Sequence, residues 1–207
     1  MISLYAVDTR PLSARFDTLV DQLPPERRRR VLSCVNREGA LGCLAGGLLL
    51  RAVFGDAANS IRTDGFGKPR LADARPFNLS HSGDYALLGV ADADIGVDIE
   101  QIRLRPFSSV AKRFFSENDQ ALLKNAADPE DTFFTLWTLK ESYLKAIGRG
   151  FYEPMRSADI RPIGESGAEL PGHGEYRFRR YRDIGGYAVA VCSLDDRFPE
   201  RIEQMQF

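Results

Sequence analysis

Hydrophobic and polar positions in the first half of the chain follow a helical period and then a strand period. Apolar residues recur at helical spacing over residues 31–54, after a start signal at Pro24-Pro25 and with an expected break near Gly39. Alternating runs between Gly and Asp turns then predict strands at residues 77–82, 85–92 and 94–100. The pattern therefore predicts helices followed by a sheet.

The second half repeats this order. Asp128 at the N-cap and Pro129 at the first helical position are typical of a helix start, and we expect the helix to run to about Ile147, where Gly-Arg-Gly ends it. Strands are predicted at residues 175–182 and 187–194. The segments SGDYALLGV and IGGYAVAVC, one in each half, also resemble each other.

These patterns predict an α+β fold, a pseudo-dimer of two similar α/β halves. We place the N-terminal half at residues 1–105 and the C-terminal half at residues 106–207, with RLRPF at 103–107 as the connector. Two similar halves that face each other leave a cleft between them, and that cleft is the expected ligand site.

Composition narrows the class of protein. With 207 residues, 43% of them hydrophobic, and a formal net charge of −1, the chain suits one or two globular domains. A balanced charge argues against nucleic acid as the main partner, and we interpret the four arginines at 27–30 as a solvated helix face.

Cysteine usage and hydropathy predict the compartment. Cys34, Cys43 and Cys192 are odd in number and share no CxxC spacing, which favours a reducing compartment over a disulfide framework or a zinc site. The N-terminus lacks a basic segment typical of a signal peptide, and the most apolar run, residues 41–50, is far shorter than the roughly 20 residues that a bilayer requires. We expect a soluble, cytoplasmic protein that does not bind a membrane.

Two acidic residues share a face of one predicted strand. Ile95, Val97 and Ile99 alternate with Gly96, Asp98 and Glu100, so the two carboxylates emerge on the same side. Like charges this close repel each other. A solvated sheet edge is the ordinary explanation for such a pair.

The helix predicted to end at Ile147 carries charges among its aromatic residues. At 100° per residue, Lys140, Glu141 and Lys145 fall among aromatic and aliphatic side chains, while Thr135, Thr138, Ser142 and Ala146 share the opposite side. A Glu141–Lys145 surface pair at i,i+4 is the ordinary explanation. A surface pair, however, belongs on the polar face, so these charges are candidates for a functional site.

Together the acids of the strand and of the helix suggest a metal site. Mg²⁺ takes oxygen ligands and is commonly held by carboxylates together with substrate phosphates. We therefore predict that Asp98, Glu100 and Glu141 hold one divalent cation and that Lys145 contacts the phosphate.

Further candidates for anion contact lie upstream. FGKP at 66–69 presents Lys68 on a turn, and LSHSG at 79–83 presents Ser80 and His81 at a strand end. The ordinary alternatives are an exposed loop lysine and a structural histidine. A serine hydrolase is disfavoured because adjacent strand residues point to opposite faces and no G-x-S-x-G elbow occurs.

The ordered set FGKP, FNLSHSG, IGVDIE, RFFSEND and WTLKESYLKAIGRG closely resembles the phosphopantetheinyl transferases of the larger, surfactin-synthetase-activating type, over about residues 24–194. The resemblance implies post-translational transfer of 4′-phosphopantetheine from coenzyme A to a serine hydroxyl of an apo acyl or peptidyl carrier protein, with release of 3′,5′-ADP. It implies coenzyme A in the cleft between the halves. It also implies Mg²⁺ as the metal, with Mn²⁺ as the alternative, and a monomer, because one chain already carries both halves.

The resemblance also implies roles for individual residues. Asp98, Glu100 and Glu141 match the metal ligands, and Glu141 matches the residue proposed to activate the serine hydroxyl. Lys145 matches a lysine that contacts the phosphate and either protonates or neutralises the leaving group. The donor contacts matched are Arg27 and Arg30 near the 3′-phosphate, Gly67, Lys68 and Pro69 on the adenine side, and Ser80 and His81 near the 3′-phosphate.

One departure from the family pattern concerns the 3′-phosphate. Members usually carry an arginine where this chain has Gly42. Either Arg37 or the pair Arg27 and Arg30 compensates, or selectivity for the 3′-phosphate is relaxed. We predict weaker discrimination between coenzyme A and its 3′-dephospho form than is usual in the family.

A carrier-docking segment is expected at residues 108–123, which contain Lys112, Arg113, Phe114 and Phe115. Carrier proteins are acidic, so basic and apolar groups suit such a surface. A packed Phe pair beside two solvated cations explains the segment equally well. Two other functions stay open at the level of sequence: a metal-dependent phosphotransferase or pyrophosphatase acting on a nucleotide, and a non-catalytic binder of coenzyme A or carrier protein.

Overall fold

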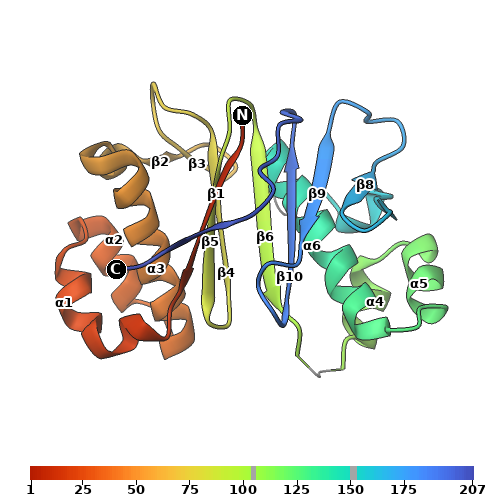
Figure 1. Cartoon of the computed structure of the whole chain (residues 1–207), viewed down its shortest axis with the longest axis horizontal. Coiled ribbons are helices and arrows are strands. Elements are labelled where there is room, and N and C mark those ends of the chain that lie inside the picture. The colour runs from red at the N-terminus through yellow and green to blue at the C-terminus, as the bar shows by residue number, and fades with distance from the viewer. Residues whose placement is uncertain (104–105, 150–152) are drawn as a thin grey trace.

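Two β-sheets stand side by side in the middle of the molecule, with helices on their outer sides (Figure 1). The computed structural model describes residues 1–103, 106–149 and 153–207. The first four-stranded sheet has the order β11-β1-β5-β4, and the second, five-stranded sheet has the order β6-β10-β9-β8-β7. A short pair, β2 and β3, forms a separate two-stranded sheet.

The first sheet is covered by the helices of the N-terminal part. Its strands are β1 (Ser3–Asp8), β4 (Phe77–Ser82), β5 (Tyr85–Val90) and β11 (Glu203–Met205), and its helices are α1 (Phe16–Asp21), α2 (Pro25–Leu32) and α3 (Arg37–Phe54). The 3₁₀ helices Pro11–Arg15 and Gly55–Ser60 and the strands β2 (Arg62–Thr63) and β3 (Pro69–Arg70) complete this part.

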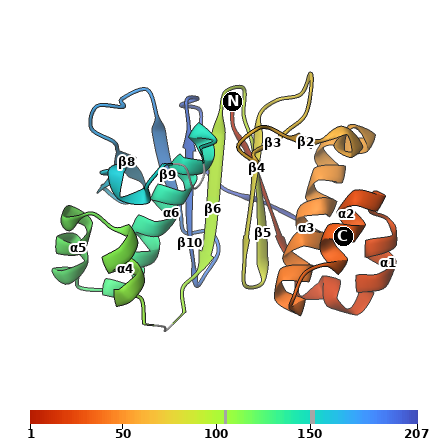
Figure 2. The same cartoon turned by 180° about the vertical axis from the view of Figure 1, so that it is seen from behind.

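The second sheet is covered mainly by one long helix. Its strands are β6 (Ile95–Gln101), β7 (Arg161–Ile163), β8 (Gly167–Glu169), β9 (Arg177–Tyr181) and β10 (Tyr187–Ser193). The helices are α4 (Ser108–Phe114), α5 (Glu117–Lys124), α6 (Pro129–Ile147) and the 3₁₀ turn Met155–Ser157. Seen from behind, α6 lies across this sheet (Figure 2).

Most elements predicted from the sequence are confirmed. The helix begins at Pro129 after an Asp128 cap and ends at Ile147, and the strand at 77–82 has the predicted bounds. The break in the first helical region lies at residues 33–36, however, and not near Gly39. The Asn36 side chain accepts a hydrogen bond from Gly39 N (2.8 Å), which caps α3 and places Gly39 inside its first turn.

The two sheets do not divide the chain in its linear order. β6, from the expected first half, pairs with β10, and β11, from the expected second half, pairs with β1. Residues 104 and 105 lie outside the described residues, so the division at 105 stays a prediction. The resembling segments occupy β5 and β10, and their tyrosines, Tyr85 and Tyr187, meet with ring centroids 5.0 Å apart.

Side chains of β4 join the two sheets. Alternate residues of β4 accept hydrogen bonds from backbone N–H groups of β6 through their side-chain oxygens. Asn78 accepts from Val97 N, Ser80 from Ile99 N and Ser82 from Gln101 N. These bonds satisfy the edge of β6 that faces β4. On their other faces both sheets share one apolar core, built from residues that include Leu4, Leu87, Ile95, Val97, Ile99, Val189 and Val191.

Helix α6 approaches β6 so closely that only glycine fits between them. A Cβ at Gly96 would lie 1.9 Å from the carbonyl oxygen of Ser142 and 2.4 Å from the backbone nitrogen of Ala146. The face that carries Thr135, Thr138, Ser142 and Ala146 is therefore buried. Small side chains on this face permit the close approach, whereas the sequence pattern suggested a polar outer face.

One segment, residues 37–60, is long and apolar enough by length and composition to cross a membrane, with a mean hydropathy of 1.4. Half of that apolar window is buried inside the structure, and the buried residues of α3 pack against strands of the first sheet.

Candidate functional site

A cavity of about 520 Å³ opens where α2, α3, β4 and the loop before β3 meet the end of α6. It collects residues that the sequence analysis singled out from distant parts of the chain. The predicted site residues that line it are Arg27, Arg30, Gly67, Pro69, Ser80, His81 and Lys145.

Lys68 is the exception among the predicted donor contacts, because it does not line the cavity. Its ammonium group is buried, donates to the Ala146 carbonyl oxygen (2.7 Å) and pairs with Asp94 (3.4 Å). Burial lowers the pKa of Lys68. Lys68 therefore ties the loop at 66–69 to the C-terminal end of α6, where free helix carbonyls favour a cation.

Asp98 and Lys145 form an ion pair between β6 and α6. The buried Asp98 Oδ1 accepts hydrogen bonds from Lys145 Nζ (2.5 Å) and from Ser80 Oγ (2.8 Å). Asp98 Oδ2 is buried and has no hydrogen-bond partner in the part of the chain that the structure describes. Ser80 therefore orients Asp98, a role that differs from the donor contact expected for it.

Ser82 orients Glu100 as Ser80 orients Asp98. The Ser82 Oγ donates a hydrogen bond to Glu100 Oε2 (2.7 Å). Sequence reasoning missed Ser82. The signal was present, since two serines spaced by two residues on β4 match two acids spaced by two residues on β6.

Glu141 completes the acidic group. Burial raises the pKa of Glu141, the negative charges of Asp98 and Glu100 raise it further, and Lys145 opposes them. Within residues 1–103, 106–149 and 153–207, however, no three His, Cys, Asp or Glu side chains lie close enough to hold one metal ion. The three carboxylates are thus electrostatic neighbours that do not form one such cluster in the described residues. Their role as metal ligands stays a prediction.

The donor set still fits a hard divalent cation. It offers carboxylate oxygens only, one of which, Asp98 Oδ2, lacks a hydrogen-bond partner among the described residues. The mutual repulsion of Asp98, Glu100 and Glu141 is also a cost that a cation removes. Mg²⁺ suits these ligands better than a softer metal would.

Gly42 lies directly under a ring of the cavity wall. A Cβ at this position would approach His81 Nδ1 to 2.6 Å. The His81 ring therefore occupies the space that a side chain at residue 42 would need.

The segment expected to dock a carrier protein is split between core and surface. Phe115 is buried and Phe114 meets the edge of Trp137, whereas Lys112 and Arg113 are exposed. The packed-Phe explanation holds for Phe115, whereas Lys112 and Arg113 are exposed cations that a partner can reach.

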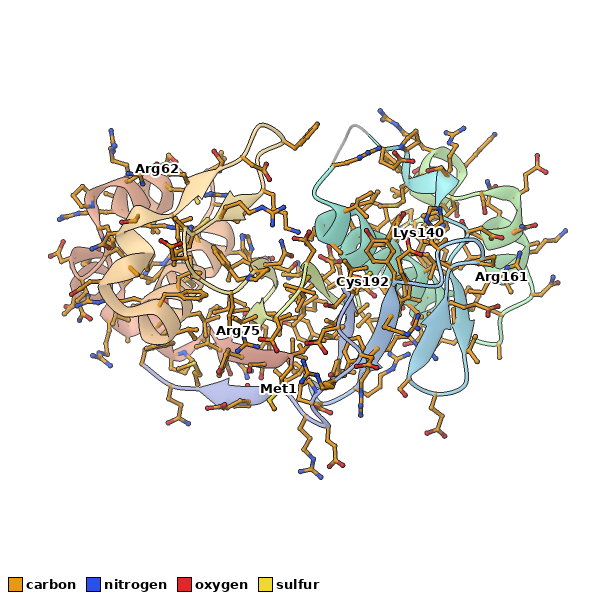
Figure 3. The ribbon with its side chains drawn as sticks, turned by 90° about the horizontal axis from the view of Figure 1, so that it is seen from above. Met1, Arg62, Arg75, Lys140, Arg161 and Cys192 are labelled. Carbon is orange, nitrogen blue, oxygen red and sulfur yellow. The ribbon has the colours of Figure 1, made fainter. Side chains whose placement is uncertain are left out.

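Lys140 is one of the three charged residues of α6 that the sequence placed among apolar side chains, and it does not line the cavity. It pairs with Asp119 (2.8 Å), and both side chains are almost fully buried. Viewed from above, Lys140 lies inside the second half, whereas Arg62, which lines the cavity, lies toward the outer end of the first (Figure 3).

Comparisons with known proteins identify the family. Residues 94–192 match the model of the 4′-phosphopantetheinyl transferase superfamily. The chain is 35% identical to the 4′-phosphopantetheinyl transferase ffp of Bacillus subtilis over 96% of this chain and 94% of that protein, and 33% identical to the transferase Sfp of Bacillus subtilis over the same shares. A holo-[acyl-carrier-protein] synthase of Thermotoga maritima superposes with a TM-score of 0.42 and 18% identity, covering 51% of this chain and 64% of that one.

The chain therefore belongs to the 4′-phosphopantetheinyl transferase superfamily. Within it, the similarity over nearly the whole chain is to the Sfp-like type that the ordered motifs predicted, and the protein is an enzyme of this class.

Proposed function

We propose that this enzyme transfers the 4′-phosphopantetheine group of coenzyme A to a serine hydroxyl of an apo acyl or peptidyl carrier protein and releases 3′,5′-ADP. One observation carries the proposal. Lys145 lines the same cavity as Arg27 and Arg30 and at the same time binds Asp98, beside Glu100 and Glu141. Lys145 thus connects the cations that would bind a phosphorylated donor with the carboxylates that would bind a metal.

The cavity suits a donor with phosphates at two places. Burial and the neighbouring Arg30 lower the pKa of the half-buried Arg27. A bound anion between the two guanidinium groups would offset their mutual repulsion and the burial of Arg27. We therefore assign Arg27 and Arg30 to the 3′-phosphate. Lys145, at the other side of the cavity, is assigned to the diphosphate, and Gly67 and Pro69 to the adenine side.

Asp98, Glu100 and Glu141 would hold Mg²⁺, or alternatively Mn²⁺. The metal would supply positive charge at the diphosphate, where phosphoryl transfer needs it. Ser80 and Ser82 fix the orientation of the two strand acids through the hydrogen bonds described above.

The side chains of this chain account for the proton transfers. Glu141 takes the proton of the serine hydroxyl as a general base, directly or through water. The serine oxygen then bonds to the phosphorus that carries pantetheine, and the bond from that phosphorus to the bridging oxygen breaks. Lys145 neutralises the charge that develops on the leaving 3′,5′-ADP.

We further propose that the carrier docks near the exposed cations of α4. An acidic carrier matches Lys112 and Arg113. Charge reversal of both, Lys112→Glu with Arg113→Glu, should raise the KM for the carrier and leave the KM for coenzyme A unchanged. Unchanged values for both substrates would reject this surface.

The carrier assay tests the function itself. The enzyme is incubated with coenzyme A, Mg²⁺ and an apo carrier domain, and the carrier is weighed by mass spectrometry. A gain of one phosphopantetheine group supports the transferase. Breakdown of coenzyme A with an unmodified carrier would indicate a hydrolase, and no reaction would indicate a binder.

Matched variants connect that assay to the site. Glu141→Gln and Lys145→Met should abolish or strongly reduce the mass gain, whereas Lys124→Met, which removes an exposed lysine at the end of α5, should leave it unchanged. Equal activity in all three would disconnect the reaction from this cavity.

The donor specificity depends on Gly42. Residue 42 is glycine, and the His81 ring fills the space that a side chain there would need, so this position supplies no cation to the 3′-phosphate. Arg27 and Arg30 would then hold the 3′-phosphate without a third cation, so we propose that the enzyme discriminates between coenzyme A and 3′-dephospho-coenzyme A less than is usual in the family. Comparable transfer rates with the two donors would support this proposal. A strong preference for coenzyme A would show that Arg27 and Arg30, or Arg37, supply the missing grip.

A further inference from the structure

Two cysteines meet at the wall of the cavity. Cys34 follows the end of α2, and Cys43 lies on α3 and lines the cavity. Their Sγ atoms are 3.4 Å apart. The side chains touch although nine positions separate them in the sequence, and both are partly exposed.

Their surroundings make the two thiols unequal. A hydrogen bond from His81 lowers the pKa of Cys43 to about 7, and Cys34 and Arg30 contribute to the same effect. Burial raises the pKa of Cys34, whose thiol also donates to the Arg30 carbonyl oxygen (3.4 Å). Cys43 is therefore the stronger nucleophile, and Cys34 is placed to react with whatever forms on it.

The third cysteine provides an internal reference. Cys192 lies in the interior of the second half, on β10, and is fully buried (Figure 3). Burial raises its pKa well above that of a free thiol. A reagent that attacks exposed, activated thiols should leave Cys192 unmodified in the folded protein.

We propose that Cys34 and Cys43 form a reversible oxidation site, at which a hydroperoxide converts the dithiol into a disulfide across the wall of the donor cavity. The Cys43 thiolate attacks the terminal peroxide oxygen, the O–O bond breaks, and hydroxide leaves from hydrogen peroxide or an alkoxide from an organic hydroperoxide. The sulfenic acid so formed is attacked by Cys34, the S–S bond closes, and water leaves with the Cys34 proton. Two electrons pass from the sulfurs to the peroxide.

The geometry allows this bond with a small movement. A disulfide needs its sulfurs about 2.05 Å apart, so the two atoms must approach by only about 1.4 Å. The bond would link Cys34, which follows the end of α2, to Cys43 on α3. Helix α2 is the helix that carries Arg27 and Arg30. It would also leave His81 without its thiolate acceptor, since a disulfide sulfur accepts hydrogen bonds only weakly.

Donor binding should in turn protect the pair, a consequence that rests on the proposed function. Phosphate oxygens that bind Arg30 and His81 would compete with the Cys43 thiolate for the same positive groups. Coenzyme A should therefore lower the thiolate fraction of Cys43 and slow its oxidation.

The test uses the whole reduced chain and hydrogen peroxide. Intact mass should fall by two hydrogen atoms, and peptide mapping should join Cys34 to Cys43 with Cys192 still free. Cys34→Ser should instead accumulate a sulfenic acid on Cys43, trapped by dimedone, and Cys43→Ser should leave Cys34 unoxidised at the same dose. Cys192→Ser, the matched control, should behave as the wild type.

Two outcomes overturn the inference: thiols at 34 and 43 that react no faster than Cys192, or a cross-link that maps to other residues. Iodoacetamide provides a second measurement that requires no disulfide, and it should alkylate Cys43 about tenfold faster than Cys34. If oxidation proceeds as expected but added coenzyme A leaves its rate unchanged, the oxidation site stands and the placement of the donor fails. The carrier assay then decides the proposed function separately.

Discussion

Helix α6 carries two lysine–aspartate pairs, and they differ in what surrounds them. Lys140 and Asp119 lie 2.8 Å apart with 0% and 1% of their side chains exposed, whereas Lys145 and Asp98 lie 2.5 Å apart with 27% and 5% exposed. Lys140 also donates to the Ala158 carbonyl oxygen, and Asp119 closes a capping box with Ser116. The first pair thus fastens α5 and the chain around Ala158 to α6.

An unpaired oxygen alone does not mark a functional site. Both aspartates bury one oxygen without a partner among the described residues, Asp98 Oδ2 and Asp119 Oδ1. Asp98 differs from Asp119 in its neighbours. Its partner Lys145 lines the cavity, and its negative charge raises the pKa of the nearby Glu141. A fully buried ion pair indicates a structural role. A partly exposed pair beside further carboxylates indicates a functional site.

The largest effect is expected from breaking the closed pair. Lys140→Met leaves the Asp119 carboxylate buried without its cation and should lower the free energy of unfolding by about 3–5 kcal/mol in urea denaturation. The double variant Asp119→Leu/Lys140→Met should regain much of that loss, because it removes both buried charges. A single variant as stable as the wild type would refute the structural role.

Lys145→Met should have the opposite signature. It should lower kcat/KM in the carrier assay about 10²–10³-fold, because it removes a charge from the leaving group. Its free energy of unfolding should change by only about 1–2 kcal/mol, because Lys145 is partly exposed. The comparison fails if the two lysine variants lose activity and stability in the same proportion.

Gly96→Ala should disturb both pairs together. The added Cβ would meet backbone atoms of Ser142 and Ala146, so α6 must shift away from β6. We expect a loss of about 1–3 kcal/mol of stability together with reduced activity. Gly174→Ala is the matched control, because a Cβ there meets nothing within 4 Å, and it should change neither quantity.

Asp128→Ala should have the smallest effect. It removes the cap that accepts a hydrogen bond from Asp131 N (3.0 Å) at the start of α6. The expected cost is about 1 kcal/mol of stability, measured by thermal or urea unfolding. Because the cap lies at the opposite end of the helix from Lys145, kcat/KM should stay at the wild-type value, and a large loss of activity would show that the two ends are coupled.

Local signals predicted the helix ends and the strand faces. Asp128 and Pro129 fix the start of α6, and Gly148 ends it in the left-handed region with φ of 70°. The alternation along β6 places Ile95, Val97 and Ile99 in a core and Asp98 toward Lys145. Such features depend on neighbours in the sequence, which is why the sequence alone was sufficient.

Long-range partners were beyond the reach of sequence patterns. Periodicity gives the face on which a residue lies and not what packs against it, so the pairing of β6 with β10 was missed, as was the match of Ser82 with Glu100. Lys68 looked like a loop lysine, and its burial under the end of α6 depends on a contact 78 positions away. The buried pair of Lys140 with Asp119 is of the same kind.

The central claim is that the acids beside Lys145 hold a divalent cation for the diphosphate of the donor. Calorimetric titration of Mg²⁺ into the enzyme saturated with coenzyme A tests it most directly. We expect one Mg²⁺ per chain in the wild type and in the control Asp128→Ala, and an affinity at least about tenfold weaker in Asp98→Asn, all three checked for native circular dichroism. Equal affinity in the wild type and in Asp98→Asn would contradict the account.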